Sequence, residues 1–347
     1  MFATVISMFK NKDIRNRIFF TLAMLFVFRF GSAITVPGVD VTELIKGMQD
    51  SSLFAMIHML GGGGLAQLSI FAMGVGPYIT ASIIIQLLSM DVIPALTELA
   101  KGGATGKKQI DRYTRYLAVV LSFFQASTLV YSFSTQYKTL LVNGSGWASI
   151  LYVATLLTAG SMFILWIGDR ISMKGIGNGV SMIIAAGIIS RLPYQFTTAW
   201  QTLVDQSNSS ATFNGILTFG LYIVSYLLII VFVVFMQTAE RKILIQYTSS
   251  TVTTRKKAMT YLPLKINSAS VIPVIFASAI MVAPLQICKM VWPAASWVKT
   301  LETYMGMQTP VSLVIYVVLI LLFTFFYTKL QVDPEKIAEN LGKSGTY

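Results

Sequence analysis

The chain has 347 residues, of which 55% are hydrophobic and only 12% carry a charge. Soluble domains carry about 25% charged residues, so this composition excludes an ordinary soluble protein and predicts one that crosses a membrane several times. A formal net charge of +12 would indicate nucleic-acid binding in a soluble protein. In a membrane protein, the placement of the charges along the chain is more informative.

Eight apolar segments predict an all-α polytopic membrane protein with eight transmembrane helices, because most of them reach the roughly 20 residues that a spanning helix needs. They lie near residues 18–36, 68–90, 116–133, 149–167, 177–192, 214–236, 266–288 and 310–328. The fifth begins within GIGNG, Gly175 to Gly179, which superficially resembles a phosphate-binding loop. No strand is expected before it and no Lys-Ser/Thr pair follows, so a flexible turn into the fifth span is favoured.

The second segment is broken by residues that disfavour a helix. Four glycines, Gly61 to Gly64, precede it, and GVGP, Gly74 to Pro77, interrupts it. Glycine costs a helix about 1 kcal/mol and proline about 3 kcal/mol. Irregular backbone at membrane depth is tolerated where it is buried in protein or lines a water-filled path. This segment therefore predicts a route through the membrane.

A related pattern surrounds Pro273 in the seventh segment, where SVIPVIFAS parallels GVGPYITAS around Pro77. Paired interruptions in matching segments indicate an inverted repeat of five plus five helices, of which this chain supplies five plus three. The alternative is two unrelated proline kinks, which are common in membrane helices.

The positive charges predict the topology. Of the 26 Lys and Arg residues, 20 lie in the N-terminal arm, the C-terminal tail and every second gap between segments, against five in the other gaps and Arg29 inside the first segment. Because cytoplasmic loops are rich in Lys and Arg, both termini are expected in the cytoplasm, with an even number of spans. The cytoplasmic gap at 237–265 is basic, polar and long enough to dock a partner.

Several kinds of chemistry are missing from the sequence. No Asp, Glu or His lies at the centre of a predicted span, which argues against a proton-coupled carrier. One cysteine, Cys288, and one histidine, His58, exclude a cysteine cluster and a histidine-based metal site. An intramembrane hydrolase is nearly excluded, since its catalytic groups are missing. A passive pore and a secondary transporter of a small solute both remain open.

Long blocks of the sequence resemble the SecY family, the central subunit of the bacterial protein-conducting channel, in the family's order and spacing. They are SIFAMGVGPYITASIIIQLL, TGKKQIDRYTRY, GDRISMKGIGNGVSMIIAAGII, YLPLKINSASVIPVIFAS and PEKIAENLGKSG. The resemblance implies a non-enzymatic channel subunit of the bacterial cell membrane, without cofactor or metal. Such a channel conducts unfolded secretory polypeptides. The family has ten spans, so the chain is expected to lack the last two transmembrane helices.

The resemblance also implies two halves and a constriction. Residues 1–195 would form the N-terminal half with five spans, and residues 196–347 the C-terminal half with three. The family closes its pore with a ring of aliphatic side chains, which motif matching places at Val75, Ile79, Val180, Ile184 and Ile275. A narrow apolar collar sheds water and blocks ions, while its side chains can move around an extended polypeptide.

Two moving parts are implied by the same resemblance. The plug, which covers the ring from outside, would lie at about 53–64 and include Leu53, Phe54, Met56, Ile57, Met59, Leu60, Gly61 and Gly62. The lateral gate, between the second and seventh spans, would release transmembrane segments into lipid. Its candidate residues are Pro77, Thr80, Gln86, Gln125, Asn267 and Pro273.

The implied partners bind outside the pore. The SecA motor ATPase or the ribosome would dock on the cytoplasmic loops, for which Arg241, Lys242, Arg255, Lys256 and Lys257 are the candidates. Contacts from these side chains to ribosomal RNA phosphates would be sensitive to salt. The SecE and SecG subunits would flank the helices. The substrates would be signal sequences and nascent or unfolded polypeptides.

Overall fold

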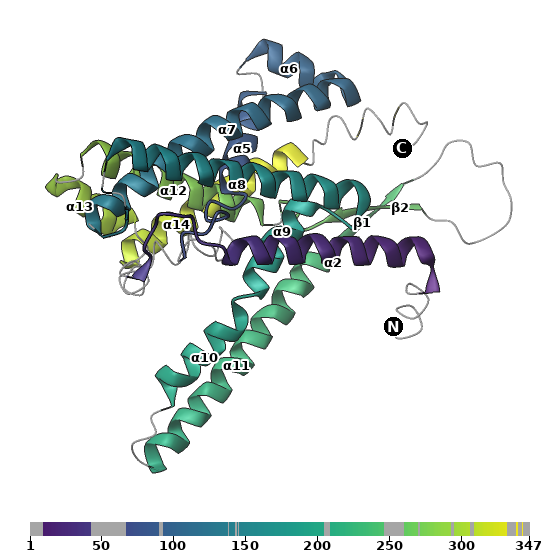
Figure 1. Cartoon of the computed structure of the whole chain (residues 1–347). Helices are drawn as coiled ribbons and strands as arrows, with labels where there is room; N and C mark the ends of the chain where they lie inside the picture. The colour runs from purple at the N-terminus through teal and green to yellow at the C-terminus, as the bar shows by residue number, and fades with distance from the viewer. Residues whose placement is uncertain are drawn as a thin grey trace, which may run out of the picture. The chain divides into compact units, whose positions relative to one another are not determined.

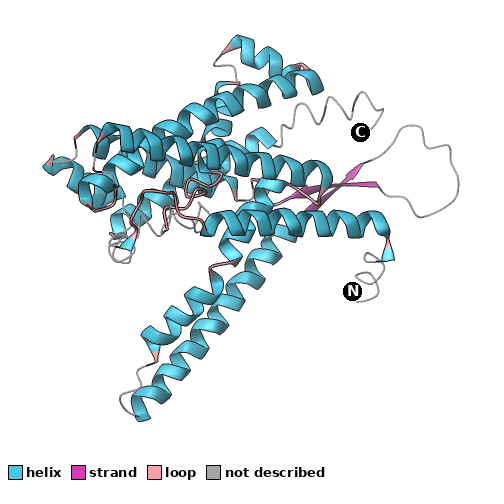
Figure 2. Cartoon of the chain, viewed as in Figure 1, coloured by secondary structure: helices cyan, strands magenta, loops and turns pink. Residues whose placement is uncertain are grey.

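The computed structural model describes residues 10–42, 67–89, 93–137, 139–142, 144, 146–204, 209–245, 260–269, 271–292, 295–305, 309–331, 338 and 342. Most of these residues are helical, and the described part of the chain also contains one pair of antiparallel strands (Figures 1 and 2). The elements are α2 (Lys12–Ala33), α5 (Gly76–Leu88), α6 (Pro94–Lys101), α7 (Gly103–Gln136), α8 (Trp147–Lys174), α9 (Gly179–Ile189), α10 (Leu192–Leu203), α11 (Ser209–Thr238), β1 (Glu240–Ile245), β2 (Thr260–Lys265), α12 (Ile272–Val291), α13 (Ser296–Met305) and α14 (Pro310–Gln331).

Each of the eight predicted apolar segments overlaps a helix, namely α2, α5, α7, α8, α9, α11, α12 and α14. Among the described residues, four helical stretches are long and apolar enough to cross a membrane: Thr105–Thr135, Trp147–Lys174, Thr212–Thr238 and Pro310–Lys329. Two shorter apolar helices, Gly76–Leu88 and Ile272–Val282, accompany them. The prediction of several apolar helices is therefore confirmed, while the number of eight spans stays a prediction.

The predicted starts of the second and seventh segments were wrong, because each helix begins only one residue before its proline. Residues 68–75 form turns and α5 starts at Gly76, one residue before Pro77. Likewise, α12 starts at Ile272, one residue before Pro273. Proline is favoured in the first helical turn, where its missing N–H has no intrahelical partner to lose. The break therefore lies upstream of Pro77, whereas Pro284 lies inside α12.

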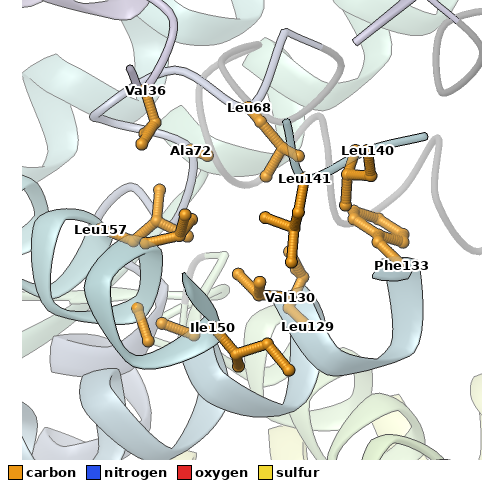
Figure 3. Packing of buried hydrophobic residues seen from close by; sticks show 13 residues of the cluster. Val36, Leu68, Ala72, Leu129, Val130, Phe133, Leu140, Leu141, Ile150 and Leu157 are labelled. Atoms are coloured by element: carbon orange, nitrogen blue, oxygen red, sulfur yellow. The ribbon is translucent and has the colours of Figure 1, made fainter. Parts of the chain in front are cut away.

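The chain divides into two compact units, one of residues 1–193 and 279–312 and the other of residues 194–278 and 313–347. In the first unit, α7 packs against α5, α6 and α8, and α8 also packs against α2 and α9. One apolar cluster fills the space between α7, α8 and the segments beside them (Figure 3). It includes Leu129 and Phe133 of α7 and Leu157 of α8. The predicted division at residue 195 stays a prediction.

In the second unit, aromatic side chains join neighbouring helices. The ring of Phe196 in α10 lies edge-on to Tyr226 of α11, with 5.6 Å between centroids. Phe276 of α12 lies against Phe323 and Tyr327 of α14, at 5.5 and 6.0 Å. The helices α10 and α11 run side by side as a hairpin (Figure 1).

The second unit also holds an element that the all-α prediction missed. Strands β1 and β2 pair antiparallel within the predicted cytoplasmic gap, with Glu240 opposite Lys265 and Ile245 opposite Thr260 (Figure 2). The strand sequences ERKILI and TYLPLK contain β-branched and aromatic residues that favour a strand. The fold is therefore mainly helical, with a β-hairpin in this gap.

Candidate functional site

A second apolar cluster, called here the α5–α9 cluster, collects side chains from the elements around the broken second segment. Its buried members are Phe28, Phe71, Val75, Ile164, Ile167, Ile171 and Ile183. Partly buried Met24, Leu25, Ile70, Ile79, Val180, Met182 and Ile184 pack against it. These residues come from α2, the turns before α5, α5 itself, α8 and α9.

Four of the five predicted ring residues belong to this cluster or pack against it. Val75 is buried, and Ile79, Val180 and Ile184 are half-buried. Val75 immediately precedes α5, and its carbonyl accepts a hydrogen bond of 3.1 Å from the Ile79 N–H. Val180 and Ile184 lie four residues apart in α9, so they share one face of that helix. Ile275, half-buried in α12, belongs to the other compact unit.

The turns that lead into α5 are held by backbone hydrogen bonds. The Val36 N–H donates to the Leu68 carbonyl and the Ile70 N–H donates to the Ile34 carbonyl, both at 3.0 Å. Each polar group satisfied in this way avoids the cost of an unpaired amide in an apolar environment. The irregular backbone before α5 is therefore a defined structure that fixes where Val75 lies.

The GIGNG motif forms the turn between α8 and α9, as the sequence predicted. The Asn178 side chain accepts a 3.2 Å hydrogen bond from the Ser181 N–H and so caps α9. Gly177 has a φ of +71°, in the left-handed region that favours glycine. The Ile176 N–H donates to the Thr21 hydroxyl at 3.1 Å, which docks the turn on α2.

The candidate gate residues differ in their surroundings. Pro77 and Pro273 are buried, each in the first turn of its helix. The Thr80 hydroxyl donates to the Gly76 carbonyl of its own helix at 3.1 Å, and the Asn267 amide donates to the Gln237 side chain at 3.4 Å. Gln86 is exposed on α5 and Gln125 is half-buried on α7. The gate assignment of these six residues stays a prediction.

Other predicted positions lie partly outside the described residues. All plug candidates, from Leu53 to Gly62, do so, as do Arg255, Lys256 and Lys257. Arg241 and Lys242 are described, and their side chains are exposed on β1 opposite Leu264 and Pro263. Of the docking candidates, these two therefore sit on a strand of the hairpin.

Charged contacts that the sequence did not reveal lie near one end of α8. The Arg115 guanidinium of α7 contacts the Asp169 carboxylate at 3.0 Å, and Arg170 lies 5.3 Å from the centre of the Trp166 ring. Their sequence signal was present only as charged residues at the ends of two predicted spans.

Among the described residues, no group of three or more His, Cys, Asp or Glu side chains lies close enough to hold a metal ion.

One carboxyl outside the helices has a shifted pKa. The Thr42 hydroxyl and the Thr42 N–H donate to Asp40 at 2.6 and 3.0 Å. These hydrogen bonds, the hydroxyl first, hold the pKa of Asp40 below its ordinary value because they stabilise the charged form. Asp40 is therefore an ionised turn cap at neutral pH.

Comparison with known proteins identifies the family. A family model described as SecY matches residues 69–347. The chain is also 42% identical over 349 residues to the protein translocase subunit SecY of Staphylococcus aureus strain NCTC 8325, covering 100% of this chain and 80% of that protein. The chain belongs to the SecY family. The SecY subunit of Streptococcus gordonii is 41% identical over 342 residues, covering 98% of this chain and 78% of that protein.

Solved structures share the SecY fold. A protein-conducting channel superposes with a TM-score of 0.65 at 16% identity, covering 96% of this chain and 77% of that one. Sec61 in the canine ribosome–channel complex gives 0.63 at 16% identity, covering 94% and 75%. At these identities the likeness concerns the fold alone.

The SecY membership decides the function that the sequence left open. The chain is the channel-forming SecY subunit of a protein translocase, a transport protein and not an enzyme. The resemblance noted in the sequence is confirmed, and the solute transporter is set aside. The mostly helical SecY-type fold is also confirmed.

Proposed function

We propose that the barrier of this channel is a ring of five aliphatic side chains, Val75, Ile79, Val180, Ile184 and Ile275. An apolar constriction excludes ions because ions and water lose their polar contacts inside it. The same side chains offer no fixed polar groups, so an extended polypeptide passes by displacing them. The barrier needs no bound ion, metal or cofactor.

One observation carries this proposal: four of the five side chains come together in the α5–α9 cluster, although they come from the start of α5 and from α9, about 100 residues apart in the sequence. Both contributing helices start next to their first ring residue, since α5 begins one residue after Val75 and α9 one residue before Val180. The helix starts therefore set the level of the ring on this side of the pore.

The moving parts and partners belong to the same proposal. A plug within residues 53–64 covers the ring, and the helices around Pro77 and Pro273 form the lateral gate. Both termini face the cytoplasm, and eight spans cross the cell membrane. The N-terminal half comprises residues 1–195 and the C-terminal half residues 196–347.

The cytoplasmic hairpin is the proposed docking element for the SecA motor or the ribosome. Positive charge in this gap would attract an acidic or RNA partner. It comes from the exposed side chains of Arg241 and Lys242 on β1 and from Arg255, Lys256 and Lys257 later in the sequence. Support for a ribosome partner comes from the fold neighbour Sec61, whose structure is that of a ribosome–channel complex. SecE and SecG are the proposed membrane subunits beside this chain.

The ring is tested by making it polar. Replacing both Ile79 and Ile184 with Asn in the assembled translocase should raise the resting ion conductance of planar bilayers about tenfold or more, the change produced by lowering a barrier by about 1.4 kcal/mol. The matched control is Ile189→Asn, which places the same group on a more exposed position of α9 that is not four residues from a ring side chain. An unchanged resting conductance in the Ile79/Ile184 variant would contradict the ring.

A further inference from the structure

We propose that α8 sets the position of the constriction through two serine hydroxyls, with Ser161 fixing the chain that enters α5 and Ser172 fixing the turn that enters α9. The inference rests on the proposed ring, because it concerns the side chains that form it. Ser161 and Ser172 are positioning residues, since they act through the backbone next to the ring and not on the passing polypeptide.

The first anchor holds the residue before Val75. The Ser161 hydroxyl donates a buried hydrogen bond of 3.0 Å to the Gly74 carbonyl. Gly74 has a φ of +55°, in the left-handed region that favours glycine and that a regular α-helix does not use. Only 2% of Ser161 is exposed, which leaves this carbonyl without water as an alternative partner.

The chain before Gly74 fits closely against α8. A side chain at Gly160 would collide with the Ile70 carbonyl, so this position of α8 has room only for glycine. Leu68 and Ala72 point into the cluster of Figure 3, whereas Phe71 and Val75 point into the α5–α9 cluster. The turns before α5 are therefore wedged between two apolar clusters, and Ser161 fixes their last carbonyl.

The second anchor holds the residue before Val180. The Ser172 hydroxyl accepts a 2.8 Å hydrogen bond from the Gly179 N–H and donates one of 3.0 Å to the Gly168 carbonyl of its own helix. A side chain at Gly179 would collide with the Gly168 carbonyl. The first N–H of α9 thus gains a partner from α8, where a helix start otherwise leaves such groups unsatisfied.

The two anchors follow one plan. In each, the glycine immediately before the first ring residue of a helix is bonded through its backbone to a serine of α8. Ser161, Gly168 and Ser172 are separated by seven and four residues, so they share one face of α8. One helix therefore carries the contacts that place both pairs of ring side chains.

The anchors are tested by the access of water to the ring. We would introduce Ile79→Cys or Ile184→Cys singly in a Cys288→Ser background and measure the reaction rate of the new thiol with a small water-soluble reagent in the assembled translocase. Ser161→Ala should raise the rate at position 79 about threefold to tenfold, with less effect at position 184. Ser172→Ala should show the reverse preference, and Ser172→Thr, which keeps the hydroxyl, should restore the parent rate.

The matched control is Ser122→Ala on α7, because Ser122 is buried and its hydroxyl has no hydrogen-bond partner among the described residues. Equal rates in Ser161→Ala, Ser172→Ala and Ser122→Ala would overturn the inference. A rise at both positions without site preference would also overturn it, since general loosening predicts that result. If the serine variants behave as expected but the Ile79/Ile184 Asn variant does not leak, then the ring is wrong and the anchors stand.

Discussion

The helices α8 and α11 have similar length and are both strongly apolar, yet they are used in opposite ways. In the most apolar 18-residue stretch of α8, 56% of the residues are buried, whereas in that of α11 none are. In α8, the small residues Gly160, Ser161 and Gly168 face neighbouring backbone. In α11, large residues such as Leu228 and Phe232 are exposed.

The difference follows from how helices associate inside a membrane. Lipid tails are as apolar as leucine, so apolar character alone does not bring helices together. Close backbone approach and hydrogen bonds do, and these need small residues and hydroxyls. A helix with small residues along one face therefore organises its unit, while a helix that exposes bulky residues along most of its length presents them to lipid or to a partner.

The largest difference between the two helices is expected when bulk is added to one glycine in each. Gly160→Leu should destabilise the protein by about 3 kcal/mol or more, because the new side chain meets the Ile70 carbonyl and the backbone must move. Gly220→Leu in α11 should cost almost nothing, since an added Cβ there meets no atom of the described neighbours within 4 Å. Unfolding in a detergent titration measures both, and equal losses would show that α8 is not the better-packed helix.

A smaller effect is expected from removing apolar bulk. Ile164→Ala in α8 should cost about 2 kcal/mol, at the low end for buried isoleucine, since lipid already solvates the unfolded side chain and mainly the cavity term remains. Ile229→Ala in α11 creates no cavity, because 59% of that residue is exposed. Thermal unfolding of the two purified variants would compare their stabilities. A larger loss of stability for Ile229→Ala would show that α11 is the better-packed helix.

The smallest effect should come from the charged end of α8. Asp169→Asn removes the ion pair with Arg115. Because the Asp169 side chain is 34% exposed and that of Arg115 is 52% exposed, the loss should be less than about 1 kcal/mol. The loss should shrink further at high salt because the pair is screened. Glu98→Gln on α6 makes the same chemical change at an exposed position. A loss above that of Ile164→Ala would place the organising contacts at the end of α8 and not along its length.

The parts of the fold that could be predicted from the sequence are those set by local composition. Apolar runs located the long apolar helices but not α6, α10 and α13. The motif GVGP located a break near Pro77, because glycine and proline act within a few residues. The exact start of α5 was missed, since Pro77 suits a first turn as well as a kink. The hairpin was missed because its two strands pair across a stretch of polar residues.

The contacts that place the ring could not be predicted from local sequence patterns. Ser161 and Ser172 lie in or beside an apolar run, where serine is read as a small filler. Their partners, Gly74 and Gly179, are defined only once α8 packs beside the turns. The ring residues themselves were assigned through the family resemblance, since Val and Ile in an apolar helix otherwise indicate only packing.

The shortness of α5 bears on how the protein is made. Its 13 residues rise about 20 Å, well below the roughly 30 Å of hydrocarbon, so this helix alone is a poor candidate for stable insertion. The Gly74 carbonyl has no hydrogen bond from the Ser161 hydroxyl until Ser161 has been synthesised, 87 residues later. The helices of the first unit therefore cannot each insert stably in the order of synthesis. Neighbouring protein must cover α5 until α8 has left the ribosome.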